Sequence, residues 1–332
     1  MNKTWLIIKR EYITRVRNRT FILSTFLTPL IFAALIAAIT YISAKNPDRN
    51  DPGTTIIVKK NGSPAKPHSS VAYGVGYSGG FLIYITLFIY GSMVMRGVME
   101  EKTSRIAEVI ISSVRPFQLM IGKIIGIGAV GLTQFFMWLL LILLFGLAAS
   151  LFIPPDLLAG AGNAGAALPG GNIQTQQALE SMANIRNEMA AVNWWLVIPA
   201  FVFYFLFGYL FYASIFAAVG STVNEDAQDA QSLMFPITMP IVLSIVIMVN
   251  SIAHPNGAMA TWSSMVPFFS PVVMMARIPF GVPWWQLTLS MLFLISGFLL
   301  TTWLGAKIYR TGILLYGKKV TWREIGRWVF RA

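Results

Sequence analysis

The sequence contains no cysteine, only two histidines and few charged residues. Without cysteine the chain can form no disulfide, no thiolate metal site and no cysteine nucleophile. His68 and His254 lie far apart and neither belongs to an HExxH motif, so a zinc site of that kind is excluded. Charged residues make up 11 % of the chain. A soluble domain usually has about 25 %, so the composition argues against a soluble globular protein.

Apolar residues make up 56 % of the 332 residues, which excludes an intrinsically disordered chain. The formal net charge is +12. In a soluble protein such a charge would suggest nucleic acid, but in so apolar a chain it indicates an uneven distribution of charge across a membrane. We therefore expect an integral membrane protein whose surroundings are the lipid bilayer, with no nucleic-acid partner.

Six apolar segments are long enough to cross a membrane, which takes about 20 residues in a helix. We predict an all-α integral membrane protein with six transmembrane helices, at about residues 21–43, 80–98, 124–153, 194–223, 232–252 and 284–305. The first segment carries no charge and is too long for a cleavable signal peptide, so we expect it to remain as a span. Residues 265–283 are apolar but interrupted by prolines, which predicts a re-entrant hairpin before the last span.

Basic residues are concentrated near both ends of the chain and between the second and third spans. With six spans these three regions share one side, and the positive-inside rule places that side, with both termini, in the cytoplasm. Residues 1–19 mix basic and apolar side chains, which predicts an interfacial helix on an anionic membrane surface. We thus expect a multi-pass membrane protein with both termini on the cytoplasmic side.

The segment after the second span has charged residues at helical spacing. Glu101 and Arg105 are four residues apart, and Arg105 and Glu108 are three apart, while apolar residues recur on a second face. Pro116 is expected to end this helix. We predict a short amphipathic helix at 99–116 on the cytoplasmic side. The pattern alone leaves two interpretations open, a solvated connection on the lipid surface and a docking helix for a cytoplasmic partner.

These residues also resemble a known family. The stretch GVMEEKTSRIAEVIISSVRPFQLMIGKIIG at 97–126 is similar to the signature region of ABC type-2 transporter permeases, close to the NatB-like sodium-efflux branch. Residues 9–30, 224–240, 268–279 and 312–325 show weaker similarities to the same branch. These segments occur along the chain in the order in which that branch has them.

The resemblance implies the permease subunit of an ATP-driven ABC exporter, with sodium efflux as the activity of the similar branch. Such a permease pairs with a second permease subunit, as a homo- or heterodimer, and each binds a cytoplasmic ABC ATPase subunit. ATP and Mg²⁺ would bind in the ATPase, so we expect no catalytic residue, cofactor or metal site in this chain. The resemblance assigns coupling to the ATPase to Glu100, Glu101, Lys102, Arg105, Glu108, Ser112 and Pro116.

One departure concerns the interval between the first two spans. NatB-like permeases have a large extracytoplasmic domain there, whereas this chain has only residues 44–79, so that domain's role cannot be transferred. The resulting plan is a single transmembrane permease domain over 1–332, with an interfacial helix at 1–19, a short extracytoplasmic loop at 44–79, a coupling helix at 99–116, a re-entrant segment at 265–283 and a cytoplasmic tail at 306–332.

Other signals are weaker. Gly122 and Gly126 form a GxxxG pattern, which indicates either close helix packing or chance in a glycine-rich membrane protein. Residues 312–319, GILLYGKK, resemble a P-loop but lack its serine or threonine and the preceding strand. The spans contain almost no charge, which disfavours a carboxylate ion site and weakens sodium as the substrate. An ATP-independent channel or a membrane assembly scaffold remains the alternative function.

Overall fold

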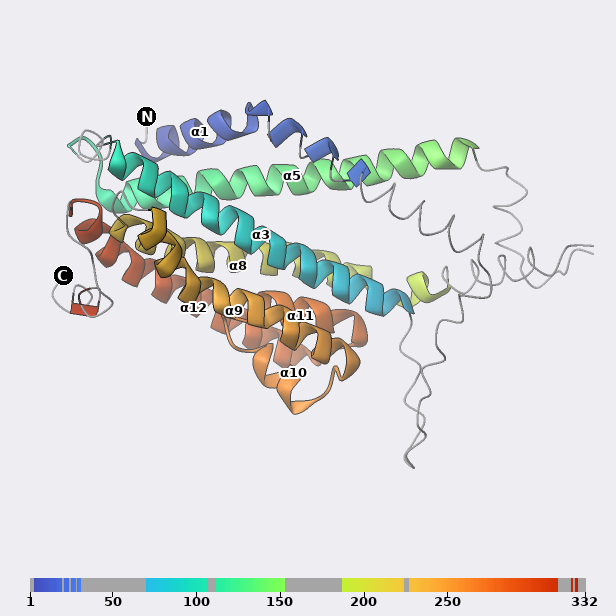
Figure 1. Cartoon of the computed structure of the whole chain (residues 1–332). Coiled ribbons are helices and arrows are strands. Elements are labelled where there is room, and N and C mark those ends of the chain that lie inside the picture. The colour runs from blue at the N-terminus through green and yellow to red at the C-terminus, as the bar shows by residue number, and fades with distance from the viewer. Residues whose placement is uncertain are drawn as a thin grey trace, which may run out of the picture. The chain divides into compact units, whose positions relative to one another are not determined.

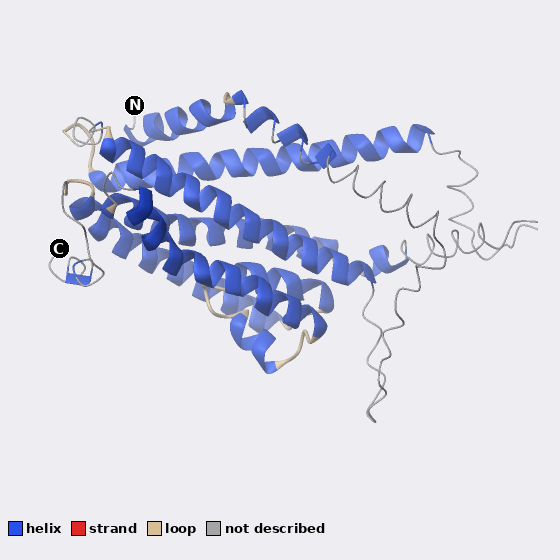
Figure 2. Ribbon diagram, in the orientation of Figure 1, coloured by secondary structure: helices blue, strands red, loops and turns tan. Residues whose placement is uncertain are grey.

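The computed structural model describes residues 3–19, 21–23, 25–27, 29–30, 70–104, 106, 112–152, 187–223, 227–315, 324 and 326–327. Within these residues the regular structure is helical and contains no strand (Figures 1 and 2). The α-helices are α1 (Lys3–Val16), α3 (Ser70–Thr103), α5 (Pro116–Phe152), α8 (Trp194–Thr222), α9 (Ala227–Ala253), α10 (Ala258–Ser263), α11 (Ser270–Arg277) and α12 (Trp284–Gly312), and the 3-10 helix η2 covers Ile278–Phe280.

Five of the described helices are long and apolar enough to cross a membrane. Their candidate spans are Val71–Thr103, Pro116–Leu141, Trp194–Thr222, Gln231–Ala253 and Trp284–Gly312. They confirm the second to sixth predicted segments. The first predicted span at 21–43 and the loop at 44–79 fall mostly outside the described residues, so the count of six stays a prediction.

Two of these helices exceed the apolar thickness of a bilayer by the widest margin. Helix α3 has 34 residues and α5 has 37. At about 1.5 Å per residue each exceeds the apolar thickness of about 30 Å by a wide margin. The charged end of α3 and the charged start of α5 can therefore lie outside the hydrocarbon region.

The boundaries of the predicted helix at 99–116 need correction. Helix α3 continues to Thr103, so residues 99–103 are its last turn rather than the start of a separate helix. Residues 112–115 are not helical, and Pro116 begins α5 instead of ending a helix. Proline suits this position because the first turn of a helix does not use its backbone N–H groups. Residues 105 and 107–111 lie outside the described part of the chain.

The helices form two compact units. The first contains residues 1–13, 69–131 and 184–332, and the second contains 14–68 and 132–183. In the first unit α8 has its most extensive contacts with α3 and α12, and it contributes many of the buried aromatic side chains. In the second unit, the indole of Trp138 donates a hydrogen bond to the Thr25 carbonyl over 3.1 Å. This bond ties the later part of α5 to the segment that follows α1.

Helix α11 lies directly against α3 because α3 has glycines at the contact. A side chain at Gly80 would come within 2.9 Å of the Val272 carbonyl oxygen, and one at Gly76 within 2.5 Å of the Ala276 carbonyl oxygen. Gly76 and Gly80 form a GxxxG pattern of the kind that brings two helix backbones together. The segment predicted as re-entrant thus contains α11 and η2, packed onto α3, while its position in the membrane stays a prediction.

Arg277 holds this segment in place from within. Its side chain has no exposed surface, and its Nε donates to the Pro255 carbonyl oxygen over 2.8 Å. Its terminal nitrogens donate to the Ser264 hydroxyl and, over 2.9 Å, to Gln286 Oε1. Arg277 therefore connects the chain on both sides of α10 with the first turn of α12.

Replacing Arg277 by methionine is expected to lower the thermal stability of the purified protein substantially. The change leaves several buried acceptors without a donor, at about 1–3 kcal/mol each. Thermal unfolding in detergent measures the loss, with Arg96→Met as the control because Arg96 is exposed on α3. Equal unfolding temperatures for the two variants would show that Arg277 does not stabilise the segment.

Candidate functional site: a buried ion-pair cluster

Four charged side chains are buried in the first unit, one in the second half of α1, two in the last turn of α3 and one near the start of α5. Glu11 and Glu101 are 7 % and 6 % exposed, and Lys102 and Lys123 are each 1 % exposed. Two acids and two bases balance in formal charge. Charged groups are almost never buried so completely unless they are paired, so each of these side chains is expected to have a partner. We call these four residues the ion-pair cluster.

Lys123 is the centre of the cluster. Its Nζ lies 3.1 Å from Glu101 Oε1 and 3.3 Å from Glu11 Oε1, and it donates to the Gly97 carbonyl oxygen over 3.0 Å. These three contacts match the three N–H donors of an ammonium group. One side chain of α5 thereby connects α1 with the last turns of α3.

Lys102 extends the cluster to a fourth helix. Its Nζ donates to the Ser221 carbonyl oxygen over 2.7 Å. Ser221 lies in the last turn of α8, where carbonyl groups have no partner within the helix and the helix dipole favours a cation. On the outer side, Arg10 Nη1 lies 3.9 Å from Glu101 Oε1 and is largely exposed. The cluster thus connects α1, α3, α5 and α8.

Two glycines of α5 allow α1 to lie close enough for these pairs to form. A side chain at Gly122 would come within 2.8 Å of Ile7 Cγ2, and one at Gly126 within 2.7 Å of Glu11 Cβ. They are the predicted GxxxG pair, and they flank Lys123 in the sequence. The N-terminal part of α1 therefore rests on the glycine surface of α5, and Glu11 is placed beside Lys123. The Lys3 ammonium adds a hydrogen bond of 2.7 Å to the Ser113 carbonyl oxygen.

The residues that were predicted to couple to an ATPase differ in their exposure to solvent. Glu100 and Ser112 are exposed, and Pro116 is half-buried. Glu101 and Lys102 are buried, so their side chains bind within the chain and are not presented on its surface. Arg105 and Glu108 lie outside the described residues. A docking role therefore stays a prediction for the exposed members.

Sequence reasoning missed two members of the cluster, Glu11 and Lys123. Each had a signal that could have been used. Glu11 is the one acidic residue of the basic segment 1–19, and Lys123 is a single charge between two glycines at the start of an apolar span. A lone charge at such a position needs a partner, although the sequence does not show which residue provides it.

Comparisons with known proteins identify the family of the chain. The sequence profile of the ABC-2 family transporter proteins matches residues 52–307. The uncharacterized protein YhaP of Bacillus subtilis is 30 % identical over 267 residues, which cover 80 % of this chain and 57 % of YhaP. The uncharacterized protein MJ1024 of Methanocaldococcus jannaschii is 26 % identical over 275 residues, covering 82 % of this chain and 58 % of that protein.

The chain therefore spans less than two thirds of the length of these relatives. No solved structure matches it. The profile match extends from the residues that precede α3 to the last turns of α12 and includes the ends of α3 and α5, where Glu101, Lys102 and Lys123 lie. The chain belongs to the ABC-2 family of transporter proteins, as a multi-pass membrane permease component.

Proposed function

We propose that the chain is the permease subunit of an ATP-driven exporter and that a separate cytoplasmic ATPase drives it. The observation that carries the proposal is the ion-pair cluster in a chain of the ABC-2 family. The cluster fixes the N-terminal helix to the connection between two candidate spans. A transporter driven by a soluble partner requires such a mechanical connection between its surface and its spans.

The exposed part of this connection provides the docking surface in our proposal. Glu100 and Ser112 lie at the surface on either side of the segment 105–111, which itself is mostly outside the described residues. A partner that displaces this connection also displaces the last turn of α3 and the first turn of α5. Because Lys123 has partners on α1 and α3, these helices are expected to move together as a rigid body.

Helix α1 is suited to a position at the membrane surface. Trp5 and Leu6 are 57 % and 46 % exposed, and basic side chains such as Lys9 and Arg10 are exposed beside them. Such a mixture is typical of a helix that lies in the membrane interface. We propose that both termini are cytoplasmic, that the membrane is the bacterial plasma membrane, and that two permease subunits pair to form the transport path.

The substrate class rests on resemblance alone. Similarity to the NatB-like branch suggests sodium efflux. The described part of the chain adds no support, because it has no group of three or more His, Asp or Glu side chains that could hold a metal ion. ATP and Mg²⁺ are proposed to bind in the partner ATPase.

Recovery of an ATPase with the tagged chain from native membranes tests the proposal. We expect an ATPase subunit in about equal amounts, and we expect Glu100→Lys to reduce its recovery by about tenfold, because reversing an interfacial charge leaves its partner unpaired. The control is His254→Lys, which adds a positive charge at an exposed position directly after the end of α9. Glu100→Lys leaves the ion-pair cluster intact, so it should not change thermal stability.

Two results would contradict the proposal. One is a permease that is recovered alone from native membranes and conducts ions without nucleotide, which would favour the ATP-independent channel. The other is equal ATPase recovery with Glu100→Lys and with the control, which would place the docking surface elsewhere.

A further inference from the structure

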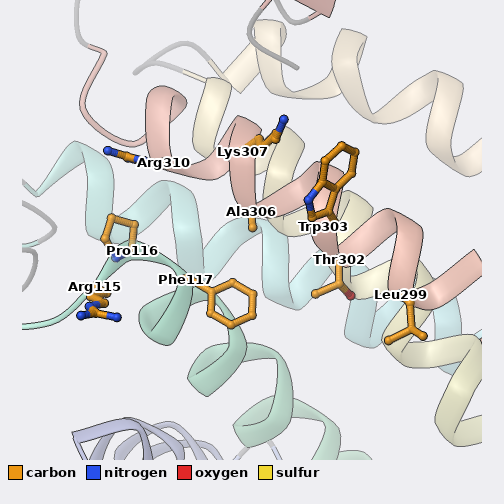
Figure 3. A pocket seen from close by; sticks show the side chains of 9 residues that line it. All are labelled: Arg115, Pro116, Phe117, Leu299, Thr302, Trp303, Ala306, Lys307 and Arg310. Atoms are coloured by element: carbon orange, nitrogen blue, oxygen red, sulfur yellow. The ribbon is translucent and has the colours of Figure 1, made fainter. Parts of the chain in front are cut away.

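A groove of about 780 Å³ lies between the start of α5 and the last turns of α12 (Figure 3). Figure 3 shows the α5 side chains on one side of the groove and the α12 side chains on the other. Its lining combines apolar and cationic side chains and contains no acidic residue. The lining residues are Arg115, Pro116, Phe117, Leu299, Thr302, Trp303, Ala306, Lys307 and Arg310.

The groove lies where two candidate spans end. Pro116 begins one span and Gly312 ends the other. Basic residues just beyond the apolar part of a span, with a tryptophan beside them, are typical of the level of the lipid headgroups. Leu299, on the side of the apolar part of α12, is 60 % exposed, as a side chain that faces acyl chains would be.

The positive charge of the groove comes from both helices. Arg115 precedes α5 and is exposed, and Arg310 is exposed on α12. Lys307 Nζ lies 4.3 Å from the centre of the Trp303 ring, a cation–π contact that fixes the ammonium at the groove. Three cations without an acid in the lining favour an anion, and guanidinium groups bind phosphate through paired hydrogen bonds.

We infer that this groove binds an anionic phospholipid, with the phosphate between Arg115, Lys307 and Arg310 and the acyl chains along Phe117 and Leu299. A ligand with one charged end and one apolar end fits this order of side chains along the groove. The volume is in the range of small-ligand sites and suffices for a headgroup with the first part of its chains. The lipid would hold the start of α5, and with it Lys123, at a fixed level in the membrane.

Quenching of Trp303 fluorescence by brominated lipid tests the inference. The chain is placed in phosphatidylcholine nanodiscs that contain either phosphatidylglycerol or phosphatidylcholine brominated near the headgroup end of one acyl chain. The Trp303 signal is the difference between the natural chain and Trp303→Phe. Each basic residue near an anionic surface favours binding about fivefold, so brominated phosphatidylglycerol should be enriched at Trp303 at least fivefold over brominated phosphatidylcholine.

The double variant Arg115→Gln/Arg310→Gln removes two of the three cations of the groove and should reduce this preference at least fivefold. The matched control Lys9→Gln/Arg96→Gln removes two exposed cations outside the groove and should retain it. Arg310→Lys keeps the charge and should also retain most of it. Equal quenching by the two brominated lipids in the natural chain would overturn the inference, whatever the variants do.

Two other occupants give distinct results. If the Arg115→Gln/Arg310→Gln variant loses the ATPase while its lipid preference is unchanged, the groove binds the ATPase and the inference is wrong. If the variant instead loses a permease dimer while its lipid preference is unchanged, the groove binds a second copy of the chain, which also overturns it. Loss of lipid preference with normal ATPase recovery supports the inference.

Discussion

Replacing Lys123 by methionine is expected to give the largest loss of stability of any single change in the ion-pair cluster. The substitution keeps the length of the side chain but leaves Glu11 and Glu101 buried without their shared cation. Removing one partner of a buried ion pair costs about 3–5 kcal/mol. Thermal unfolding of the purified chain in detergent measures the effect, and Arg96→Met, at an exposed position on α3, is the matched control.

Neutralising the whole group distinguishes charge from packing. The triple variant Glu11→Gln/Glu101→Gln/Lys123→Met has no unpaired charge at this position, so it should unfold at a higher temperature than Lys123→Met alone. In Lys123→Met the two carboxylates have lost both their hydration and their cation. The triple variant buries no charge at these three positions, so it avoids this cost. A triple variant that is no more stable than the single one would mean that the pairs contribute little beyond the space that the side chains fill.

Replacing Gly126 by leucine is expected to separate α1 from α5. The new side chain would meet the Ile8 carbonyl oxygen at 3.1 Å and Glu11 Cβ at 2.7 Å, so the backbone of α1 must move away. Overpacking costs about 1–3 kcal/mol, so a thiol reagent should label a cysteine at Ile7 about tenfold faster in this background. The natural chain has no cysteine, so the label reports this position alone.

Gly74→Leu is the control for this measurement. Gly74 also lies in a helix, but a side chain there meets nothing within 4 Å. Its labelling rate at Ile7 should equal that of the unchanged background. If Gly126→Leu also leaves the rate unchanged, α1 does not rest on α5 through its glycines.

The sequence was sufficient to locate the five spans that the structure describes, because a bilayer requires each spanning helix to be long and apolar. The candidate spans in α8 and α9 agree with the predicted segments within one residue at each end, whereas those in α3 and α5 differ by several residues at both ends. These ends could not be placed because α3 and α5 continue as helices beyond the apolar thickness. Helix propensity rather than hydropathy decides where such an end lies, and Glu100 to Thr103 continue α3 without interruption.

The candidate site was predicted in part. Charges at helical spacing identified Glu101, and the family resemblance added Lys102, but both were expected on an exposed surface, whereas both side chains are buried. Burial depends on partners that are distant in sequence, such as Glu11, which is 112 residues away from Lys123. The GxxxG pattern identified Gly122 and Gly126 without indicating that α1 is the helix that packs on them.

The most direct test of the account is a disulfide between α1 and α5. The Cβ of a side chain at Gly122 would lie 3.0 Å from Ile7 Cβ, close enough for a disulfide after a small adjustment. We predict that Ile7→Cys/Gly122→Cys forms this bond under mild oxidation in native membranes, as should the control pair Ser214→Cys/Thr302→Cys, whose hydroxyls are 2.9 Å apart. A cross-link in the control pair but not between α1 and α5 would mean that α1 is not attached to α5. The coupling role of the ion-pair cluster depends on this attachment, so that result would contradict the account.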